Sequence, residues 1–273
     1  MRRVLSGQQI LITGASSGIG RALAELAAEN GANLILTSRS AERLEQVADS
    51  IRSEGHSACV CPADVTKAED RSRLFSFIEE RLDRLDILVN NAGIGSFGHF
   101  ANSSEDVLRQ VMETNFFAPA EMMRLALPLL RRAQDPLIIN VGSKCGRRGL
   151  PAWPEYSASK FALCGLTEAL RAEFSRFGVD LLMVLPGLTA TEMDAALLRR
   201  EGRMRIDFAG GASPRKVAAQ IWKAATRKRT EVVVGGDARA LLLFNRLFPR
   251  LLDRLIARKV MSLYAREATP IAG

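Results

Sequence analysis

Residues 9–20 read "QILITGASSGIG", an apolar run followed at once by a glycine-rich turn. The run at 9–13 is short and apolar on both faces, as a buried strand is. Gly14, Gly18 and Gly20 permit a tight turn into a helix, whose free N–H groups favour an anion such as a pyrophosphate. A strand, a glycine turn and a helix in this order predict the first unit of a dinucleotide-binding sheet.

The rest of the chain repeats the alternation of strand and helix. Further short apolar runs lie at 33–38, 57–61, 86–90, 136–140, 180–185 and 231–234, and helical patterns at 21–29, 41–54, 67–82, 106–131, 156–177 and 214–227. Apolar strands joined by helical crossovers imply a parallel sheet covered on both faces. We predict the α/β class, with a single doubly wound Rossmann-type domain and a mainly parallel seven-stranded sheet. Residues 1–236 would form the dinucleotide-binding catalytic domain and 237–273 an amphipathic helical C-terminal extension of it.

Composition narrows the kind of protein. The 273 residues carry a net charge of +8, but residues 238–266 alone carry +6, so the remainder is close to balanced and a nucleic-acid surface is not expected. The four cysteines lack metal-binding spacing, and the chain runs directly into a strand without a long apolar leader. We expect no metal site and a reducing, cytoplasmic setting.

The end of the second strand indicates which dinucleotide is bound. An acid at this point usually meets a free ribose 2′-hydroxyl, whereas an arginine accommodates a 2′-phosphate. The sequence "TSRS" places Ser38 and Arg39 here. This favours NADP(H), the alternative being a solvated arginine at a strand end.

Several motifs occur in a fixed order between residues 8 and 235. They are "TGASSGIG" at 13–20, "NNAG" at 90–93, Asn115, Ser143, "YSASK" at 156–160 and "PGLTAT" at 186–191. In this combination the chain resembles the short-chain dehydrogenase/reductase family. The resemblance implies an oxidoreductase that transfers a hydride between NADP(H) and a carbonyl or secondary alcohol of a moderately apolar small molecule.

The resemblance also implies four catalytic roles. Tyr156 would be the general acid or base, and Lys160, one helical turn along, would bring the phenol pKa nearer to working pH and bind the nicotinamide ribose. Ser143 would orient the substrate carbonyl. Asn115 would hold a water that connects Lys160 to solvent. Without this context, tyrosine and lysine four residues apart are also found in ordinary buried helices.

A larger set would contact the cofactor. It comprises Gly14, Ser16, Ser17, Gly18, Ile19, Gly20, Ser38, Arg39, Asp64, Val65, Asn91, Ala92, Gly93, Tyr156, Lys160, Pro186, Gly187, Thr189 and Thr191. Asp64 resembles the family's acidic contact to the adenine, although an ordinary turn residue would look the same.

The segment 192–213 would select the substrate. It mixes apolar residues, including Met204, with Arg199, Arg200, Arg203 and Arg205, and ends on two glycines, as a mobile lid does. A 3-oxoacyl thioester and a long-chain or sterol-like ketone are not distinguished. A non-catalytic NADPH-binding scaffold is the alternative from another class, and the intact catalytic set speaks against it.

The C-terminal segment 238–266 is amphipathic and basic. Arginines recur every four residues from Arg246 to Arg258 beside a parallel apolar series, and Pro249 divides the pattern into two helices. Charges interrupt every apolar run short of a membrane span. We expect either peripheral membrane contact or packing on the domain or on a second subunit, as in a homo-oligomer.

Overall fold

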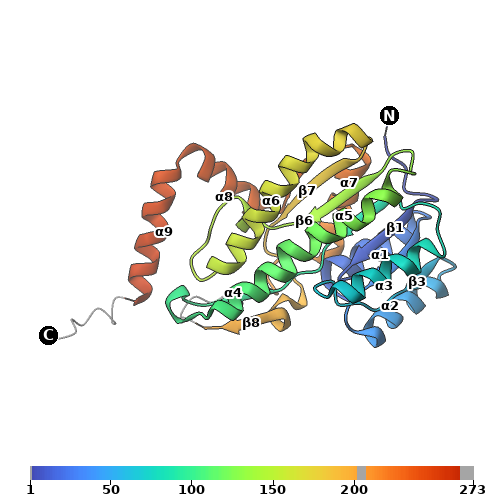
Figure 1. Ribbon diagram of the computed structural model, residues 1–273. Coiled ribbons are helices and arrows are strands. Elements are labelled where there is room, and N and C mark those ends of the chain that lie inside the picture. The colour runs from blue at the N-terminus through green and yellow to red at the C-terminus, as the bar shows by residue number, and fades with distance from the viewer. Residues whose placement is uncertain (1, 202–206, 265–273) are drawn as a thin grey trace.

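A seven-stranded sheet forms the centre of the molecule (Figure 1). The computed structural model describes residues 2–201 and 207–264. The strands are β1 (Gln9–Thr13), β2 (Asn33–Thr37), β3 (Ala58–Val60), β4 (Ile87–Asn90), β6 (Leu137–Val141), β7 (Asp180–Pro186) and β9 (Glu231–Val234). Their order is β3-β2-β1-β4-β6-β7-β9, and every neighbouring pair is parallel. The predicted seven-stranded parallel sheet is confirmed.

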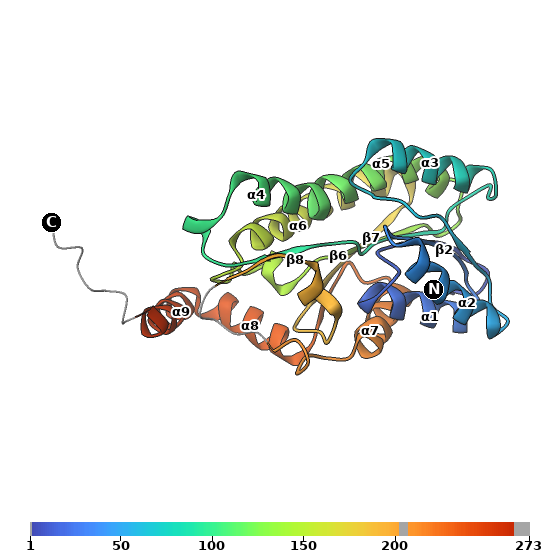
Figure 2. The same cartoon turned by 90° about the horizontal axis from the view of Figure 1, so that it is seen from below.

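Helices cover both faces of this sheet, as predicted. Figure 2 shows α1 (Gly18–Glu29), α2 (Ala41–Ser53) and α7 (Pro214–Thr226) on one side, and α3 (Ala68–Glu79), α4 (Glu105–Met112), α5 (Ala118–Leu130) and α6 (Pro154–Phe174) on the other. Along β1, Ile10 and Ile12 join the core cluster of the first face and Leu11 that of the second. A strand that is buried on both sides has a continuous apolar sequence, which is why β1 could be predicted from the sequence.

Two parts of the fold differ from the predicted elements. The pattern at 106–131 predicts one helix, but a π-helical turn at Glu113–Phe117 separates α4 from α5. A second, two-stranded sheet pairs β5 (Gly95–Phe97) with β8 (Leu197–Arg200). Strands this short, one of them ending in two arginines, have no periodicity to recognise, and only tertiary contact brings them together.

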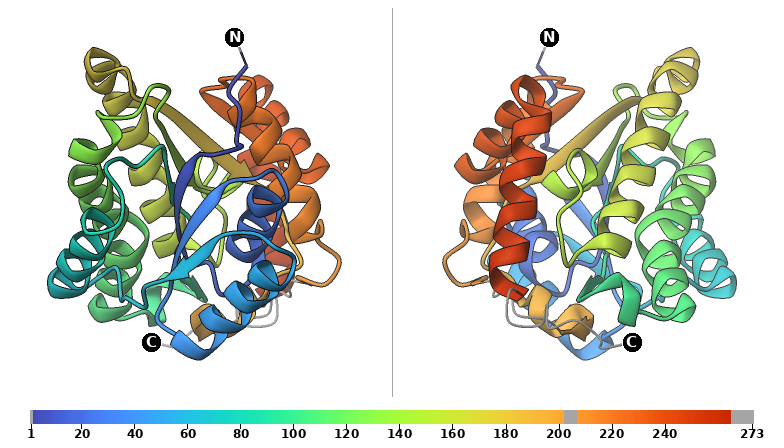
Figure 3. Two further views of the ribbon diagram at one scale, coloured as in Figure 1. Left: turned by 90° about the vertical axis from the view of Figure 1, so that its right-hand side faces the viewer. Right: turned by 90° about the vertical axis from the view of Figure 1, so that its left-hand side faces the viewer.

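The C-terminal segment forms two helices, α8 (Gly236–Leu247) and α9 (Pro249–Tyr264), which Figure 3 shows beside the domain. The predicted division at Pro249 is therefore observed, while Arg266 of the predicted basic segment lies outside the described residues. Among the residues that the structure describes, no helix is both long and apolar enough to cross a membrane.

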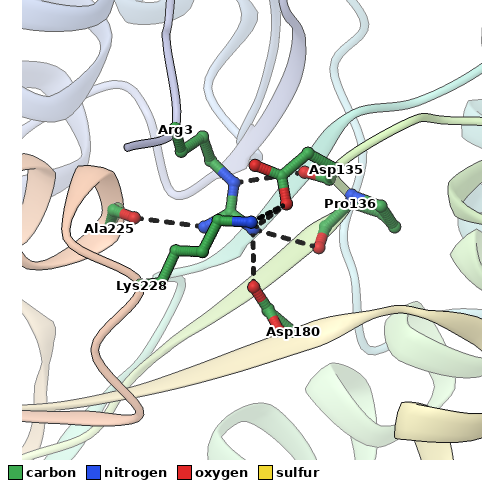
Figure 4. Close-up of polar contacts among 6 residues, drawn as sticks. All are labelled: Arg3, Asp135, Pro136, Asp180, Ala225 and Lys228. Atoms are coloured by element: carbon green, nitrogen blue, oxygen red, sulfur yellow. Dashed lines mark hydrogen bonds and ion pairs between the residues drawn. The ribbon is translucent and has the colours of Figure 1, made fainter. Parts of the chain in front are cut away.

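A buried arginine ties the N-terminal arm to the amino end of the sheet (Figure 4). The Arg3 side chain is only 1% exposed and forms ion pairs with Asp135 (3.0 Å) and Asp180 (2.8 Å). Its guanidinium also donates to the backbone oxygen of Ala225, near the C-terminal end of α7, at 3.1 Å. A cation at that end of a helix is favourable because the helix dipole is negative there. Arg3 thus joins α7 to the chain segments that begin β6 and β7.

Replacing Arg3 with methionine should destabilise the fold by about 2–4 kcal/mol, because the buried carbonyls and two carboxylates lose a shared donor. Arg2→Met, at the exposed neighbouring position, is the matched control and should change stability by less than about 0.5 kcal/mol. Urea unfolding of both variants measures the effect. Equal midpoints for Arg3→Met and the wild type would contradict this assignment.

Candidate active site

The turn after β1 and the segment after β4 are in direct contact. The Thr13 hydroxyl accepts hydrogen bonds from the backbone N–H groups of Asn91 (2.9 Å) and Ala92 (3.0 Å). The Asn91 side chain donates to the backbone oxygens of Thr13 (3.0 Å) and Gly14 (3.2 Å). A Cβ atom on Gly20 would lie 2.2 Å from the Gly14 oxygen, so only glycine fits there. The β1 turn and the β4 end therefore form one rigid unit.

This unit borders a cavity of about 650 Å³. Many of the predicted cofactor residues line it: Gly14, Ser16, Ser17, Gly18, Ile19, Ser38, Arg39, Asp64, Val65, Asn91, Ala92, Gly93 and Thr191. The cavity lies at the carboxyl ends of β1 and β4, where the strand order reverses.

Other predicted cofactor residues lie elsewhere. Gly20 packs beneath the turn, and Pro186 ends β7. Gly187 donates its N–H to the backbone oxygen of Val234 at 2.7 Å. The Thr189 hydroxyl donates to the Gly187 oxygen at 3.2 Å. Pro186, Gly187 and Thr189 therefore belong to the end of β7 and the loop after it, and they do not line the cavity.

A second arginine lines the cavity four residues after Arg39. Arg43 lies in the first turn of α2 and, like Arg39, lines the cavity. Its guanidinium lies 2.5 Å from a carboxylate oxygen of Glu192, which follows β7 and also lines the cavity. Arg43 was not among the residues predicted from the sequence, although its spacing of four residues from Arg39 was the available signal.

Asn115 is buried in the π-helical turn and its side chain is fully engaged. Its amide accepts from the N–H of Ile94 and donates to the oxygen of Ile94, both at 2.9 Å. It also donates to the Ser159 hydroxyl at 3.0 Å. A π turn inside a helix often marks a functional position, and here it directs Asn115 between the β4 end and α6.

Ser143, Tyr156 and Lys160 lie close together and are nearly buried, with exposed fractions of 9%, 9% and 4%. The Lys160 ammonium is 5.6 Å from the centre of the Tyr156 ring and donates to the Val141 oxygen at 3.2 Å. Ser143 follows β6 and its hydroxyl accepts from the Cys145 N–H at 3.1 Å. These three residues are not among those that line the cavity, but Gly93 connects the two groups, because its Cβ position would be 3.6 Å from the Lys160 nitrogen.

Burial shifts the pKa values of Tyr156 and Lys160 in the directions that favour their neutral forms. It raises the pKa of Tyr156, and the Ser143 hydroxyl offsets part of that rise. It also lowers the pKa of Lys160 to about 8. The expected lowering of the phenol pKa by Lys160 is therefore not seen in the protein by itself, because desolvation dominates.

An aromatic cluster borders Tyr156. The Trp153 ring lies 5.2 Å from Tyr156, 5.3 Å from Phe97 and 6.5 Å from Phe208. Phe97 belongs to β5 and Phe208 to the predicted lid, so the small second sheet contributes to an apolar wall near the phenol. The sequence analysis missed Trp153, which no periodic pattern marks.

The predicted lid is only partly described. It forms a 3-10 turn at Glu192–Ala196 and then β8, which pairs with β5. Arg203, Met204 and Arg205 lie outside the described residues. Arg199 is nearly buried, with its guanidinium 3.9 Å from the buried Glu155 carboxylate.

Comparison with known proteins gives consistent matches. A family model described as short chain dehydrogenase matches residues 8–202. An uncharacterized oxidoreductase of Bacillus subtilis, YxnA, is 34% identical over 258 residues, which are 93% of this chain and 72% of that protein. The ketoacyl reductase HetN of Nostoc sp. is 32% identical over 260 residues, 92% of this chain and 88% of the relative.

Two solved structures superpose closely. A short-chain dehydrogenase/reductase from Burkholderia phymatum in complex with NAD has a TM-score of 0.83 at 24% identity, covers 92% of this chain and 96% of its own, and shows the common fold. An alcohol dehydrogenase from Thermococcus sibiricus complexed with 5-hydroxy-NADP has a TM-score of 0.75 at 26% identity, with coverage of 84% and 96%.

The fold and the matches define an oxidoreductase that binds a nicotinamide dinucleotide. The chain belongs to the short-chain dehydrogenase/reductase family.

The lowered Lys160 pKa predicts a pH dependence of stability. The pKa of Lys160 falls from 10.5 to about 8 in the folded protein, so between these values the folded state has lost a proton that the unfolded state keeps. The unfolding free energy attributable to Lys160 therefore rises with pH across this window, by about 3 kcal/mol, and is lowest below pH 8. Urea titrations of the wild type and Lys160→Met from pH 7 to 10.5 measure the difference, and a difference independent of pH would contradict the shift.

Proposed function

We propose that the protein transfers a hydride between NADP(H) and the carbonyl or secondary alcohol of a moderately apolar small molecule. The observation that carries this proposal is the placement of Ser143, Tyr156 and Lys160 next to one another, with Gly93 between Lys160 and the dinucleotide-sized cavity. A module that only binds a nucleotide has no use for a buried proton donor beside a buried ammonium.

The cavity fits a dinucleotide. Gly14 has a φ of +64° and its Cβ position would be 2.9 Å from the Ala92 Cα, so the turn is bare backbone at the start of α1. Backbone N–H groups at a helix start favour a pyrophosphate. When bound, the nicotinamide supplies the hydride donor or acceptor.

The two arginines support the choice of NADP(H). Arg39 and Arg43 line the same end of the cavity, and Ser40 caps α2 there by accepting from the Arg43 N–H at 3.4 Å. Two guanidinium groups beside a helix start would stabilise a dianionic 2′-phosphate. The NAD complex of the Burkholderia phymatum protein shows that the fold alone does not decide the cofactor.

The chain's own residues would manage the proton. Tyr156 would donate it to the carbonyl oxygen, or accept it in the reverse direction, with the Ser143 hydroxyl orienting that oxygen. At neutral pH Lys160, with a pKa of about 8, is mostly protonated, so its charge would stabilise a phenolate as it forms. Asn115 would hold α6 at a fixed distance from the β4 end through Ile94 and Ser159.

The substrate is proposed to be apolar near its reacting carbon. The Trp153 cluster beside Tyr156 supports this, because Trp153 and Phe208 are half-buried aromatic side chains near the phenol. The name of the ketoacyl reductase of Nostoc sp. favours a 3-oxoacyl thioester as the alternative to a long-chain or sterol-like ketone.

Self-association is proposed as well. Phe117 at the end of the π-helical turn, Leu125 on α5 and Phe161 on α6 are large apolar side chains with 37–49% exposure. Such groups are typical of subunit interfaces. This supports the predicted homo-oligomer, with α5 and α6 as the contact.

Tyr156→Phe should lower carbonyl reduction by about 10²–10⁴-fold, because the general acid is lost while the ring keeps its packing. The measurement is NADPH oxidation over a panel of ketones graded in chain length and charge. NADPH affinity and thermal stability serve as controls and should stay within about twofold and a few degrees of the wild type. Full turnover by the variant would contradict the assigned role.

Arg39→Asp and Arg43→Gln should each weaken NADP⁺ binding about 10–100-fold and leave NAD⁺ binding within a few-fold, because each loses a charge-assisted contact to the phosphate. Arg52→Gln, further along α2 where its partners are Glu45 and Asp49, is the control and should change neither affinity. Calorimetry with both cofactors gives the answer. Parallel losses for NADP⁺ and NAD⁺ would mean that the arginines do not read the 2′-phosphate.

A further inference from the structure

The two C-terminal helices expose an unusual number of large apolar side chains. Leu243, Leu247, Phe248, Leu251, Leu255 and Met261 are 46–68% exposed. Of these, Leu247, Leu251 and Leu255 recur every four residues, while the adjacent Leu252 is buried. Helix α9 packs mainly against α8, and Figures 1 and 3 show both at one end of the molecule. We call this surface of α8 and α9 the C-terminal face.

The charges on α9 are mostly positive. Arg250, Arg254, Arg258 and Lys259 are exposed on α9. Asp253, the single acid of this helix, is 62% exposed but pairs with Arg148 of the domain at 2.5 Å. Among the ion pairs of residues 2–201 and 207–264, none involves these four cations.

This combination of exposed apolar and basic side chains favours one kind of partner. A second copy docked by two-fold symmetry would bring the arginines of one α9 close to those of the other, which costs free energy unless acids intervene. An anionic lipid surface would cover the exposed leucines and also neutralise the arginines. The leucines would enter the acyl boundary, while the arginine stems would extend to the headgroups.

The C-terminal face is also joined to the loops around the candidate active site. Asp237, in the first turn of α8, pairs with Lys144 at 2.6 Å and accepts from the Leu188 N–H at 3.0 Å. Lys144 follows Ser143 directly, and Leu188 follows Gly187. Burial works to raise the pKa of Asp237, but Lys144 and the Leu188 N–H outweigh it and hold that pKa below its ordinary value.

Two further contacts reach the same loops from α9. The Tyr264 hydroxyl lies 2.7 Å from the His99 ring nitrogen, next to β5. Arg148, five residues after Ser143, contacts Asn245 at 3.2 Å as well as Asp253. The loops after β5, β6 and β7 are therefore each tied to α8 or α9.

We propose that the C-terminal face docks the protein on an anionic membrane, with the loops that flank Ser143 and Tyr156 held close to the lipid. Docking stands independently of the proposed reaction. The delivery of apolar carbonyl substrates from the bilayer follows from it and rests on the proposed function.

Flotation of the full chain with vesicles tests docking without any assay of activity. We expect binding to vesicles of phosphatidylcholine with phosphatidylglycerol, weak binding to phosphatidylcholine alone, and a loss on raising salt. Arg250→Gln/Arg254→Gln/Arg258→Gln should lower the partition coefficient about 100-fold. The control removes three exposed arginines elsewhere, Arg109→Gln/Arg124→Gln/Arg132→Gln, and should bind as the wild type does.

A second variant, Leu251→Asp/Leu255→Asp, tests the apolar part of the face at exposed positions that should not affect folding. It should also lose vesicle binding. Equal losses of vesicle binding for the α9 triple variant and the control triple variant would mean that only net charge matters, which would overturn the proposal. Absence of flotation by the wild type would also overturn the proposal. So would a dimer, measured by light scattering, that Leu251→Asp/Leu255→Asp dissociates without changing lipid binding, since a second copy would then cover the face.

Discussion

The contact between the glycine turn after β1 and the end of β4 is the constraint on which the site depends. Both segments are irregular backbone, and their polar groups satisfy one another through Thr13 and Asn91. The missing side chains of Gly14 and Gly20 allow this approach, so a larger residue would separate the two strands where the strand order reverses. The cavity lies beside this contact and is bordered by the neighbouring loops.

A second linkage runs from that contact to α6. Asn115 interrupts a helix with a π turn, and in exchange its amide holds Ile94 and Ser159 together. The Ser159 hydroxyl donates in turn to the backbone oxygen of Tyr156 at 2.8 Å. The Tyr156 turn of α6 is thereby linked to the β4 end by side-chain hydrogen bonds in a buried region, where such bonds are strong and costly to break.

The sequence predicted those parts of the fold that have a local cause. Buried parallel strands leave apolar runs, and a glycine turn that opens a helix has a recognisable spacing, so the seven strands and about half of the residues that line the cavity could be predicted from the sequence. The π turn, the β5–β8 pairing and the Trp153 cluster arise from contacts between distant segments, and no window of sequence contains them. Nothing in the sequence around Arg3 indicates that it is buried, because its burial depends on Asp135 and Asp180 far along the chain.

In the proposed reaction, burial of the Tyr156–Lys160 pair would make proton transfer depend on what binds beside it. The protein by itself raises the pKa of Tyr156 and lowers that of Lys160, so both groups are pushed toward their neutral forms. In the same low-dielectric surroundings any added charge acts strongly. Tyr156 would therefore keep its proton beside an uncharged ligand and would ionise more readily beside a cationic one. In the proposed reaction the same two residues would thus serve as base in one direction and as acid in the other.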